Sequence, residues 1–255
     1  MAILANARIV MWQGGSLWVV DAIAPADRNR TEPHAHHAIQ LTIPLGGAIS
    51  LRGAGLEIRG QPVAIAPDFE HVFEANGLTA HLFIEPESRS GRTIARTLLP
   101  NAALAPVAPS TLGDFAARIA ANFGAPARDD AALAALGRGL IDHLAGSTTG
   151  DAPDLRVRKM IVAAAQRIGG PVSLSDVAGT GGLSASRLRH LFVEQTGLPF
   201  RTYLLWLRLC RALEVAAGGA SLTQAAHEAG FADSAHFSRT FRRMFGVTPA
   251  ALRMA

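Results

Sequence analysis

The stretch Glu32 to Gln40, EPHAHHAIQ, places three histidines within four positions, and a glutamine follows the second of them by four residues. Neutral imidazoles and carboxamide oxygens are plausible ligands for zinc, nickel, iron or manganese. In a β-strand, alternate side chains point to the same side, so His34, His36 and Gln40 would share one face and His37 the opposite face. The spacing therefore indicates a metal site, a pocket whose polar groups bind an organic effector, or histidines with a purely structural role.

These histidines lie in a region, residues 8 to 86, that consists of short apolar runs separated by Gly, Pro and Asn. Such spacing is typical of an all-β sandwich or barrel, so a closed or double-sheet β domain is expected. The expected strands are RIVMW, LWVV, HAIQLTIPL, AISLRG, LEIRG, PVAIAP, HVFEA and TAHLFIE. His81, in the last of them, either lines the same cavity or packs in the core.

After EPESRSG the apolar residues recur at the helical period instead. They are Ile94, Leu98, Leu99, Leu112, Phe115, Ile119, Phe123, Leu133, Leu136, Leu140, Ile141 and Leu144. This pattern predicts a helical hairpin whose apolar stripes pack on the β domain or on a second copy of the chain. The run AGSTTGDAPD, residues 145–154, has the composition of a linker and indicates a domain boundary.

Charge divides the chain at the same place. Residues 155–255 contain 13 Lys and Arg against 5 Asp and Glu, a net +8, whereas residues 1–154 have 11 against 15, a net −4. A basic C-terminal part is a candidate nucleic-acid binder, because Lys and Arg replace phosphate counterions. No window is long and apolar enough for a membrane span, so we expect a cytoplasmic protein. The lone cysteine, Cys210, excludes a disulfide framework within the chain.

The basic part contains an internal near-repeat, residues 173–197 and residues 221–246, each with Ser-Leu, a glycine turn and an amphipathic helix that ends before a glycine. Two helix-turn-helix units are the economical interpretation. Ser173 with Asp176, and Ser221 with Gln224, form capping-box patterns at the first helix of each unit. The second helices are expected to begin at Ser184 and near Asp233, and Gly182 and Gly230 fall in the turns.

Helical spacing then separates buried from exposed positions on the two second helices. The exposed faces are candidates for the DNA major groove, where Arg can make two hydrogen bonds to guanine and Ala can touch a thymine methyl group. The base-facing candidates are Ser186, Arg189, His190, Ser234, Ala235, Ser238 and Arg239, and the phosphate-contacting candidates are Arg187, Arg242 and Arg243. The long apolar helix between the repeats, PFRTYLLWLRLCRALEVAA, would fix the distance between them so that they enter successive major grooves.

The segment from Val157 to Arg253 resembles the DNA-binding domain of AraC/XylS-type bacterial transcription regulators. The resemblance is carried above all by GFADSAHFSRTFRRMFGVTP. It implies that both recognition helices bind adjacent major grooves, and that the protein is a homodimer that binds an operator, responds to a small effector and acts on RNA polymerase.

The N-terminal part resembles, more weakly, the cupin-like sensor domain of such regulators. His34, His36 and Gln40 fit the first cupin motif, and His71 fits the later histidine, which implies these four residues as effector or divalent-metal ligands. The sequence departs from the motif, because Arg28 stands where a glycine is expected, Gln40 replaces the acidic ligand, and the proline-to-histidine spacing before His71 is shortened.

We therefore expect an α+β multidomain protein. Its parts are a cupin-like β-barrel or jelly-roll sensor domain (1–100), a helical hairpin for dimerisation (101–145), a linker (146–154) and an all-α DNA-binding domain with two helix-turn-helix motifs (155–255). The expected function is a sequence-specific regulator without enzymatic activity, controlled by a small molecule or a metal. The alternative is a metal-dependent cupin enzyme, an oxygenase or isomerase with a helical appendage, but that leaves the duplicated motif and its charge without a role.

Overall fold

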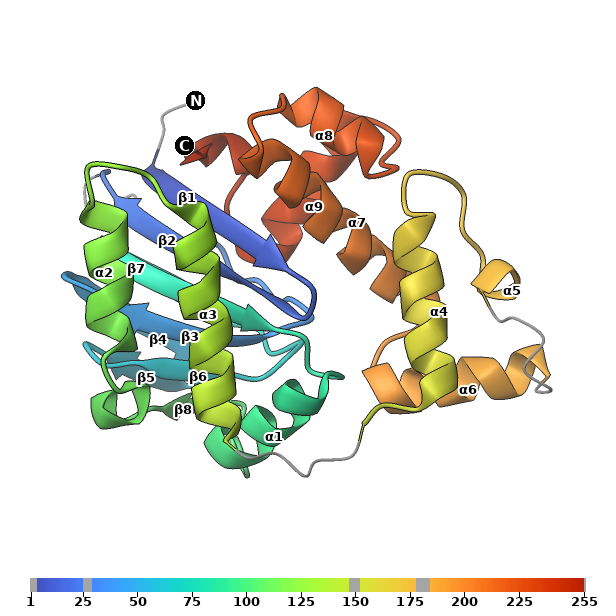
Figure 1. The fold of residues 1–255 in the computed structure, drawn as a ribbon, viewed down its shortest axis with the longest axis horizontal. Helices are drawn as coiled ribbons and strands as arrows, with labels where there is room; N and C mark the ends of the chain where they lie inside the picture. Colours follow the sequence, from blue (N-terminus) through green and yellow to red (C-terminus); the bar gives the residue numbers. More distant parts are fainter. Residues whose placement is uncertain (1–3, 25–28, 147–151, 178–183, 255) are drawn as a thin grey trace.

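A computed structural model describes residues 4–24, 29–146, 152–177 and 184–254, and it has an N-terminal β domain with a helical domain docked beside it (Figure 1). The expected division into a β-rich and a helical part is confirmed. The strands are β1 (Ala5–Trp12), β2 (Gly15–Ala22), β3 (Ile39–Pro44), β4 (Ala48–Gly53), β5 (Leu56–Arg59), β6 (Val63–Ile65), β7 (Val72–Ile84), β8 (Leu104–Pro106) and β9 (Leu252–Met254).

The strand order is β8-β6-β3-β7-β2-β1-β9, with β4 paired to β7 and β5 paired to β4. Two segments expected as separate strands, HVFEA and TAHLFIE, form the single strand β7. Its first half pairs with β4, and its second half lies between β2 and β3. The two halves meet at Gly77, whose φ of +88° suits glycine. The strands β8 and β9 were not anticipated, because their three-residue segments LAP and LRM contain no run of β-branched or aromatic residues.

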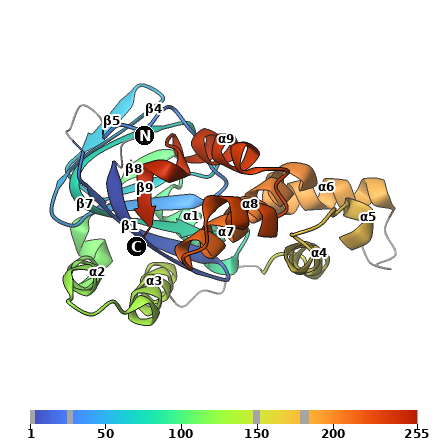
Figure 2. The ribbon, with the colours of Figure 1, turned by 90° about the horizontal axis from the view of Figure 1, so that it is seen from above.

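Both faces of this sheet are covered by helices, and adjacent strand residues point to opposite sides. On one side, Val10, Leu17 and Leu82 pack against the helices that follow the β domain. On the other side, Ile9, Trp18 and Phe83 pack against the C-terminal domain. Figure 2 shows the two helical layers on opposite sides of the strands. The helices of the first layer are α1 (Arg89–Leu98), α2 (Phe115–Gly124) and α3 (Asp130–Ala145), with the short η2 (Pro109–Leu112) before α2.

The helical hairpin therefore buries its apolar stripe within the chain. Leu133, Leu136 and Leu140 of α3 are at most 8% exposed and belong to the same core as the sheet residues. The sequence predicted that these stripes pack either on the β domain or on a second copy of the chain, and in the structure they pack on the β domain.

The closeness of α3 to the sheet depends on Gly137. A Cβ atom at this position would lie 2.4 Å from the Trp12 ring and 3.2 Å from Leu17 Cβ. We expect Gly137→Ala to lower the free energy of unfolding by about 1–3 kcal/mol, because overpacking moves neighbours out of their rotamers. Gly124→Ala on α2 is the matched control, since no atom lies within 4 Å of its added Cβ. Urea unfolding of both variants checks this, and equal midpoints would contradict it.

The C-terminal domain consists of α4 (Leu155–Gln166), α5 (Leu174–Val177), α6 (Ala185–Thr196), α7 (Phe200–Ala217), α8 (Leu222–Glu228), α9 (Ser234–Phe245) and η3 (Pro249–Ala251). The N-terminal half of α7 packs with α4 and α6, and its C-terminal half packs with α8 and α9. The two units are thus joined by one helix, as the sequence predicts.

The predicted caps are present. Ser184 and Asp233 accept hydrogen bonds from the first turns of α6 and α9, and Ser221 with Gln224 forms a complete capping box. Gly197 and Gly246 end α6 and α9 in the left-handed conformation. Gly182 and residues 147–151 of the predicted linker lie outside the described residues. Among the helices that the structure describes, none is long and apolar enough to cross a membrane.

Candidate functional site

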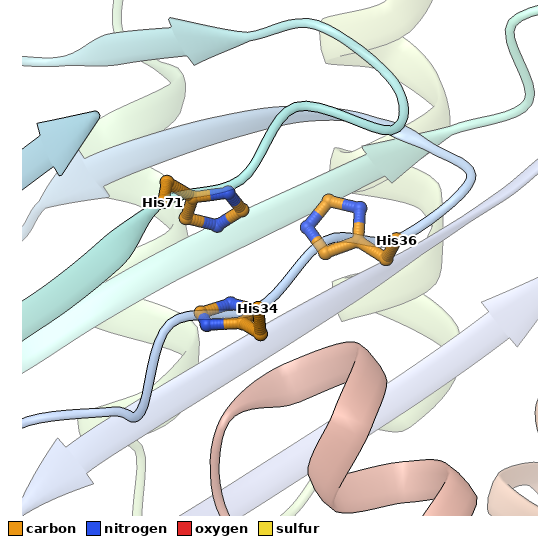
Figure 3. A group of neighbouring side chains, drawn as sticks. All are labelled: His34, His36 and His71. Atoms are coloured by element: carbon orange, nitrogen blue, oxygen red, sulfur yellow. The ribbon is translucent and has the colours of Figure 1, made fainter. Parts of the chain in front are cut away.

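Three of the sequence-predicted residues, His34, His36 and His71, converge at one end of the β domain (Figure 3). Each can offer one ring nitrogen, and these three nitrogens lie within 4.8 Å of one another. His34 and His71 are joined by two backbone hydrogen bonds of 3.0 and 2.9 Å, just before β3 and β7 begin. The three rings are 1–5% exposed. We call these three residues the histidine cluster. Their side chains are already close together and are almost completely buried from solvent.

Hydrogen bonds fix which nitrogen of each ring bears the lone pair. His34 Nδ1 donates to the Glu32 carbonyl oxygen at 2.8 Å, and His71 Nδ1 donates to that of Phe69 at 2.9 Å, because a carbonyl can only accept. The Nε2 atoms of both rings are then free to bind a metal. His36 is reversed, since its Nε2 bonds to Gln40 Oε1 at 2.7 Å.

Two of the lone-pair nitrogens, His36 Nδ1 and His71 Nε2, are buried without a hydrogen-bond partner among the described residues. Leaving a buried acceptor unsatisfied costs free energy, so such groups usually mark an ion, a water or a ligand. Three imidazoles facing one point suit Zn²⁺ and other borderline divalent metals. The residues present therefore fit a metal.

Gln40, predicted as a fourth ligand, points both ends of its amide at other residues. Its Oε1 accepts from His36, and its Nε2 donates to Thr42 Oγ1 at 2.7 Å and approaches His81 Nδ1 at 3.3 Å. Sequence spacing places Gln40 on the correct face but cannot show that its amide is already engaged. In this arrangement Gln40 orients His36, which is how residues behind a metal ligand commonly act.

Burial keeps the cluster neutral. Desolvation lowers the pKa of His34 to about 3, and the neighbouring His71 adds to the effect. Desolvation also lowers the pKa of His36 and of His71. Neutral imidazoles are the form that binds metals.

His37 has the opposite environment, although residues 34–37 precede β3 and do not form the strand that the prediction assumed. Its Nδ1 lies 3.0 Å from Asp68 Oδ2 and its Nε2 lies 3.6 Å from Glu87 Oε2. Burial by itself would lower the pKa of His37, but the hydrogen bond to Asp68 and the nearby Glu87 carboxylate raise it to about 9. His37 is therefore a cation and is no part of the histidine cluster.

A cavity of about 110 Å³ adjoins the histidine cluster, between the sheet and the C-terminal domain. Its walls are mostly apolar and include the aromatic rings of Trp18, Phe83 and Phe245. His34, Gln40 and His81 form part of its polar lining. Such a cavity can hold a small apolar molecule with one hydrogen-bonding end. His81 is thus both buried and part of the cavity wall, two roles that the sequence presented as alternatives.

The predicted DNA-contacting residues fall on α6 and α9. On α6, Ser186, Arg187, Arg189 and His190 are all exposed. On α9, Ala235, Arg239, Arg242 and Arg243 are exposed, while Ser234 and Ser238 are half-buried. The exposed Arg of α6 and α9 can reach phosphates or base edges.

Arg242 is already paired, however, with Glu32 of the β domain. Its Nε donates to Glu32 Oε2 at 2.8 Å, and its Nη2 donates to Oε1. In this structure Arg242 is therefore not a free phosphate contact. Sequence reasoning missed Glu32, because no local pattern connects residues 210 positions apart.

Comparison with known proteins places the helix-turn-helix units in a family. Residues 177–255 match the model of a family described as a helix-turn-helix domain. The transcriptional activator RhaR of Pectobacterium atrosepticum is 44% identical over 71 residues, which are 28% of this chain and 25% of that protein. The transcriptional activator RhaS of Escherichia fergusonii is 36% identical over 101 residues, 39% of this chain and 36% of that protein. The C-terminal part of the chain is therefore a helix-turn-helix domain similar to those of the RhaR and RhaS activators.

The match to RhaR spans about a quarter of that relative's length. Structural similarity reaches further along the chain. The crystal structure of ToxT from Vibrio cholerae superimposes with a TM-score of 0.56 and covers 97% of this chain and 96% of ToxT, at 12% sequence identity. Identity this low shows the fold alone. The order of a β domain followed by two helix-turn-helix units is therefore shared over the whole chain.

Proposed function

We propose that the protein is a sequence-specific transcriptional regulator of the AraC/XylS type, controlled by a small-molecule or metal effector bound in its N-terminal domain. The observation that supports DNA binding best is the family match over residues 177–255 together with exposed arginines on both recognition helices. The domains would be 1–100 for sensing, 101–145 as the hairpin, 146–154 as linker and 155–255 for DNA binding.

We place the effector in the N-terminal domain because the histidine cluster and the cavity lie there side by side. A divalent metal would be held by His34, His36 and His71, with Gln40 orienting His36, and would act as a fixed positive charge that ties together the two segments before β3 and β7. An organic effector would instead occupy the cavity against Trp18 and Phe83. ToxT of Vibrio cholerae, for comparison, has been crystallised with an unsaturated fatty acid bound.

The remaining partners follow from the same proposal. A cytoplasmic homodimer would bind paired operator sites and contact RNA polymerase. Because the apolar stripe of α3 is buried against the sheet, a dimer formed through the hairpin would use the outer face of α3, which carries the exposed residues Ala131, Ala135, Arg138, Asp142 and His143. Regulation would be linkage, in which the effector binds one domain arrangement better and shifts the population that can span the operator.

The DNA-binding proposal is tested with Arg189→Ala and Arg239→Ala. Each is expected to weaken binding to an operator selected by the full chain by about 1–3 kcal/mol, because a bidentate contact to guanine is lost. Binding to random duplex should fall much less. Arg96→Ala, an exposed arginine on α1, is the control. Fluorescence anisotropy measures both affinities, and equal losses on both duplexes would show phosphate contacts without base recognition.

The metal-dependent enzyme, an oxygenase or isomerase, is favoured only by the histidine cluster itself. The two proposals differ in what a cluster variant changes. In a regulator, His71→Ala alters the response of DNA binding to the effector. In an enzyme, His71→Ala abolishes turnover, and DNA binding plays no part in the activity.

A further inference from the structure

The second helix-turn-helix unit is docked on the β domain directly beside the histidine cluster. Strand β9 pairs in parallel with β1, and Leu4 N donates to Ala251 O at 2.8 Å. Phe245, the last residue of α9, packs with its ring centroid 4.7 Å from that of Trp18 and 5.8 Å from that of His36. A recognition helix therefore ends in contact with a candidate metal ligand.

One residue, Glu32, joins the two sites through three separate groups. Its carbonyl oxygen accepts from His34 Nδ1 at 2.8 Å, which fixes the ring that offers Nε2 to the cluster. Its N–H donates to the Gly246 carbonyl oxygen at 2.9 Å, at the end of α9. Its carboxylate pairs with Arg242 on the same helix, and that bond lowers the pKa of Glu32. Glu32 is therefore bonded to both sites at once.

Gly246, at the end of α9, packs tightly against Glu32 and His34. A Cβ at Gly246 would lie 2.4 Å from the Glu32 carbonyl oxygen and 2.7 Å from His34 Nδ1. Figure 3 shows the red-tinted C-terminal helix passing close to His34. While α9 is docked, Gly246 therefore holds Glu32 and the His34 ring in place, and a ring held in place binds metal better than a mobile one.

We propose that Glu32 makes metal binding and DNA binding compete: a divalent metal at His34, His36 and His71 strengthens the docking of α9 and keeps Arg242 from DNA phosphates. The inference rests on the proposed function, since it requires that α9 binds DNA. The Glu32 and Arg242 side chains are 53% and 55% exposed, so their ion pair is open to exchange with a phosphate. Coupling is reciprocal, so DNA must weaken metal binding by the same factor by which the metal weakens DNA binding.

The DNA side is tested with Glu32→Gln in the full chain, with Glu70→Gln as the control. Glu70 is an exposed carboxylate of the same domain that makes no ion pair with any described residue, so both variants remove one negative charge. The probe is a random-sequence duplex that spans two successive major grooves, with Zn²⁺ or excess chelator present. Zinc-loaded Glu32→Gln should bind it on the order of 10-fold more tightly than zinc-loaded wild type. Its slope of log K against log salt should be steeper by about 0.9, for one regained phosphate contact.

Chelation should raise the affinity of the wild type for the duplex by a similar factor and change that of Glu32→Gln little. If Glu32→Gln behaves as Glu70→Gln does, the tighter binding is a general charge effect and the inference is wrong. If zinc has no effect on the wild type, the coupling is absent. A wild type with no affinity for the duplex in either condition would instead overturn the proposed function, which keeps the two failures distinguishable.

The metal side uses zinc alone, measured by competition with a chromophoric chelator, so it has a readout independent of DNA. Glu32→Gln and Arg242→Gln break the same ion pair from opposite ends, and both should lower zinc affinity by a common factor, on the order of 10-fold. Glu70→Gln should leave zinc affinity unchanged. Should Glu32→Gln fail to fold, Arg242→Gln carries the test alone. Wild-type zinc affinity in Arg242→Gln would overturn the inference.

Discussion

Replacing His71 with alanine is expected to lower zinc affinity by more than about 100-fold, because loss of a residue behind a metal ligand already costs 10–100-fold and His71 is itself a ligand. Its Nε2 is buried, carries the lone pair and has no hydrogen-bond partner among the described residues. The measurement is isothermal titration of metal-free protein with Zn²⁺ at neutral pH, where the three imidazoles are neutral.

The control is His143→Ala. His143 is an exposed histidine of α3 that bonds to the Thr111 carbonyl oxygen, far from the cluster in the fold. It removes one imidazole without touching the three ligands, so zinc affinity should not change. Elemental analysis of protein purified without an affinity tag or chelator complements the titration. Equal zinc binding by wild type and His71→Ala would assign the cluster to an organic effector instead.

The metal-free protein is expected to lose stability steeply as the pH falls below 6.5. His34 and His81 have pKa values of about 3 in the folded chain, lowered first by burial, against 6.5 when unfolded. Between these values the unfolded state binds more protons, so stability rises with pH in that window, and each group contributes up to about 1.4 kcal/mol per pH unit. Lowered pKa values at His36 and His71 act in the same direction.

Two other groups, Glu85 and His37, have raised pKa values, and both affect how stability changes with pH. Burial raises the pKa of Glu85 to about 7. Between pH 4.5 and 7 this carboxyl group stabilises the folded state as the pH falls, so it offsets the contribution of one histidine. The contribution of His37 is complete below pH 6.5 and is lost only as the pH rises through about 9, so it does not vary in the acid range. The net expectation is a loss of stability from pH 6.5 to pH 5.5, of about 1 kcal/mol for two histidines against one glutamate, and larger with His36 and His71 included.

Urea unfolding with chelator present, at a series of pH values from about 7 to about 5, measures this slope. His81→Gln is the decisive variant, because it removes one buried imidazole that is outside the cluster. Its slope should be lower by up to about 1.4 kcal/mol per pH unit, the full value being reached near pH 5. A stability profile that is flat across this range in the wild type would show that the buried imidazoles can be protonated without cost.

Local sequence determined much of this protein. Short apolar runs separated by Gly, Pro and Asn located β1 to β6 and both halves of β7. His37 does lie apart from His34 and His36, but these three residues precede β3, so strand alternation is not the cause. Ser184, Ser221 and Asp233 fixed the helix starts, because the first N–H groups of a helix need an acceptor within a few residues. These signals are local, and local interactions can be read from adjacent residues.

Only the tertiary structure decided how the two functional parts meet. The engaged amide of Gln40, the wall that Phe245 adds to the cavity, the pairing of β9 with β1 and the ion pair of Arg242 with Glu32 all join residues distant in sequence. No periodicity or cap encodes them, because they depend on which surfaces become adjacent after each domain has buried its own core. The sequence thus determined a β domain and a domain with two helix-turn-helix units, and the tertiary packing decided that α9 rests against the histidines.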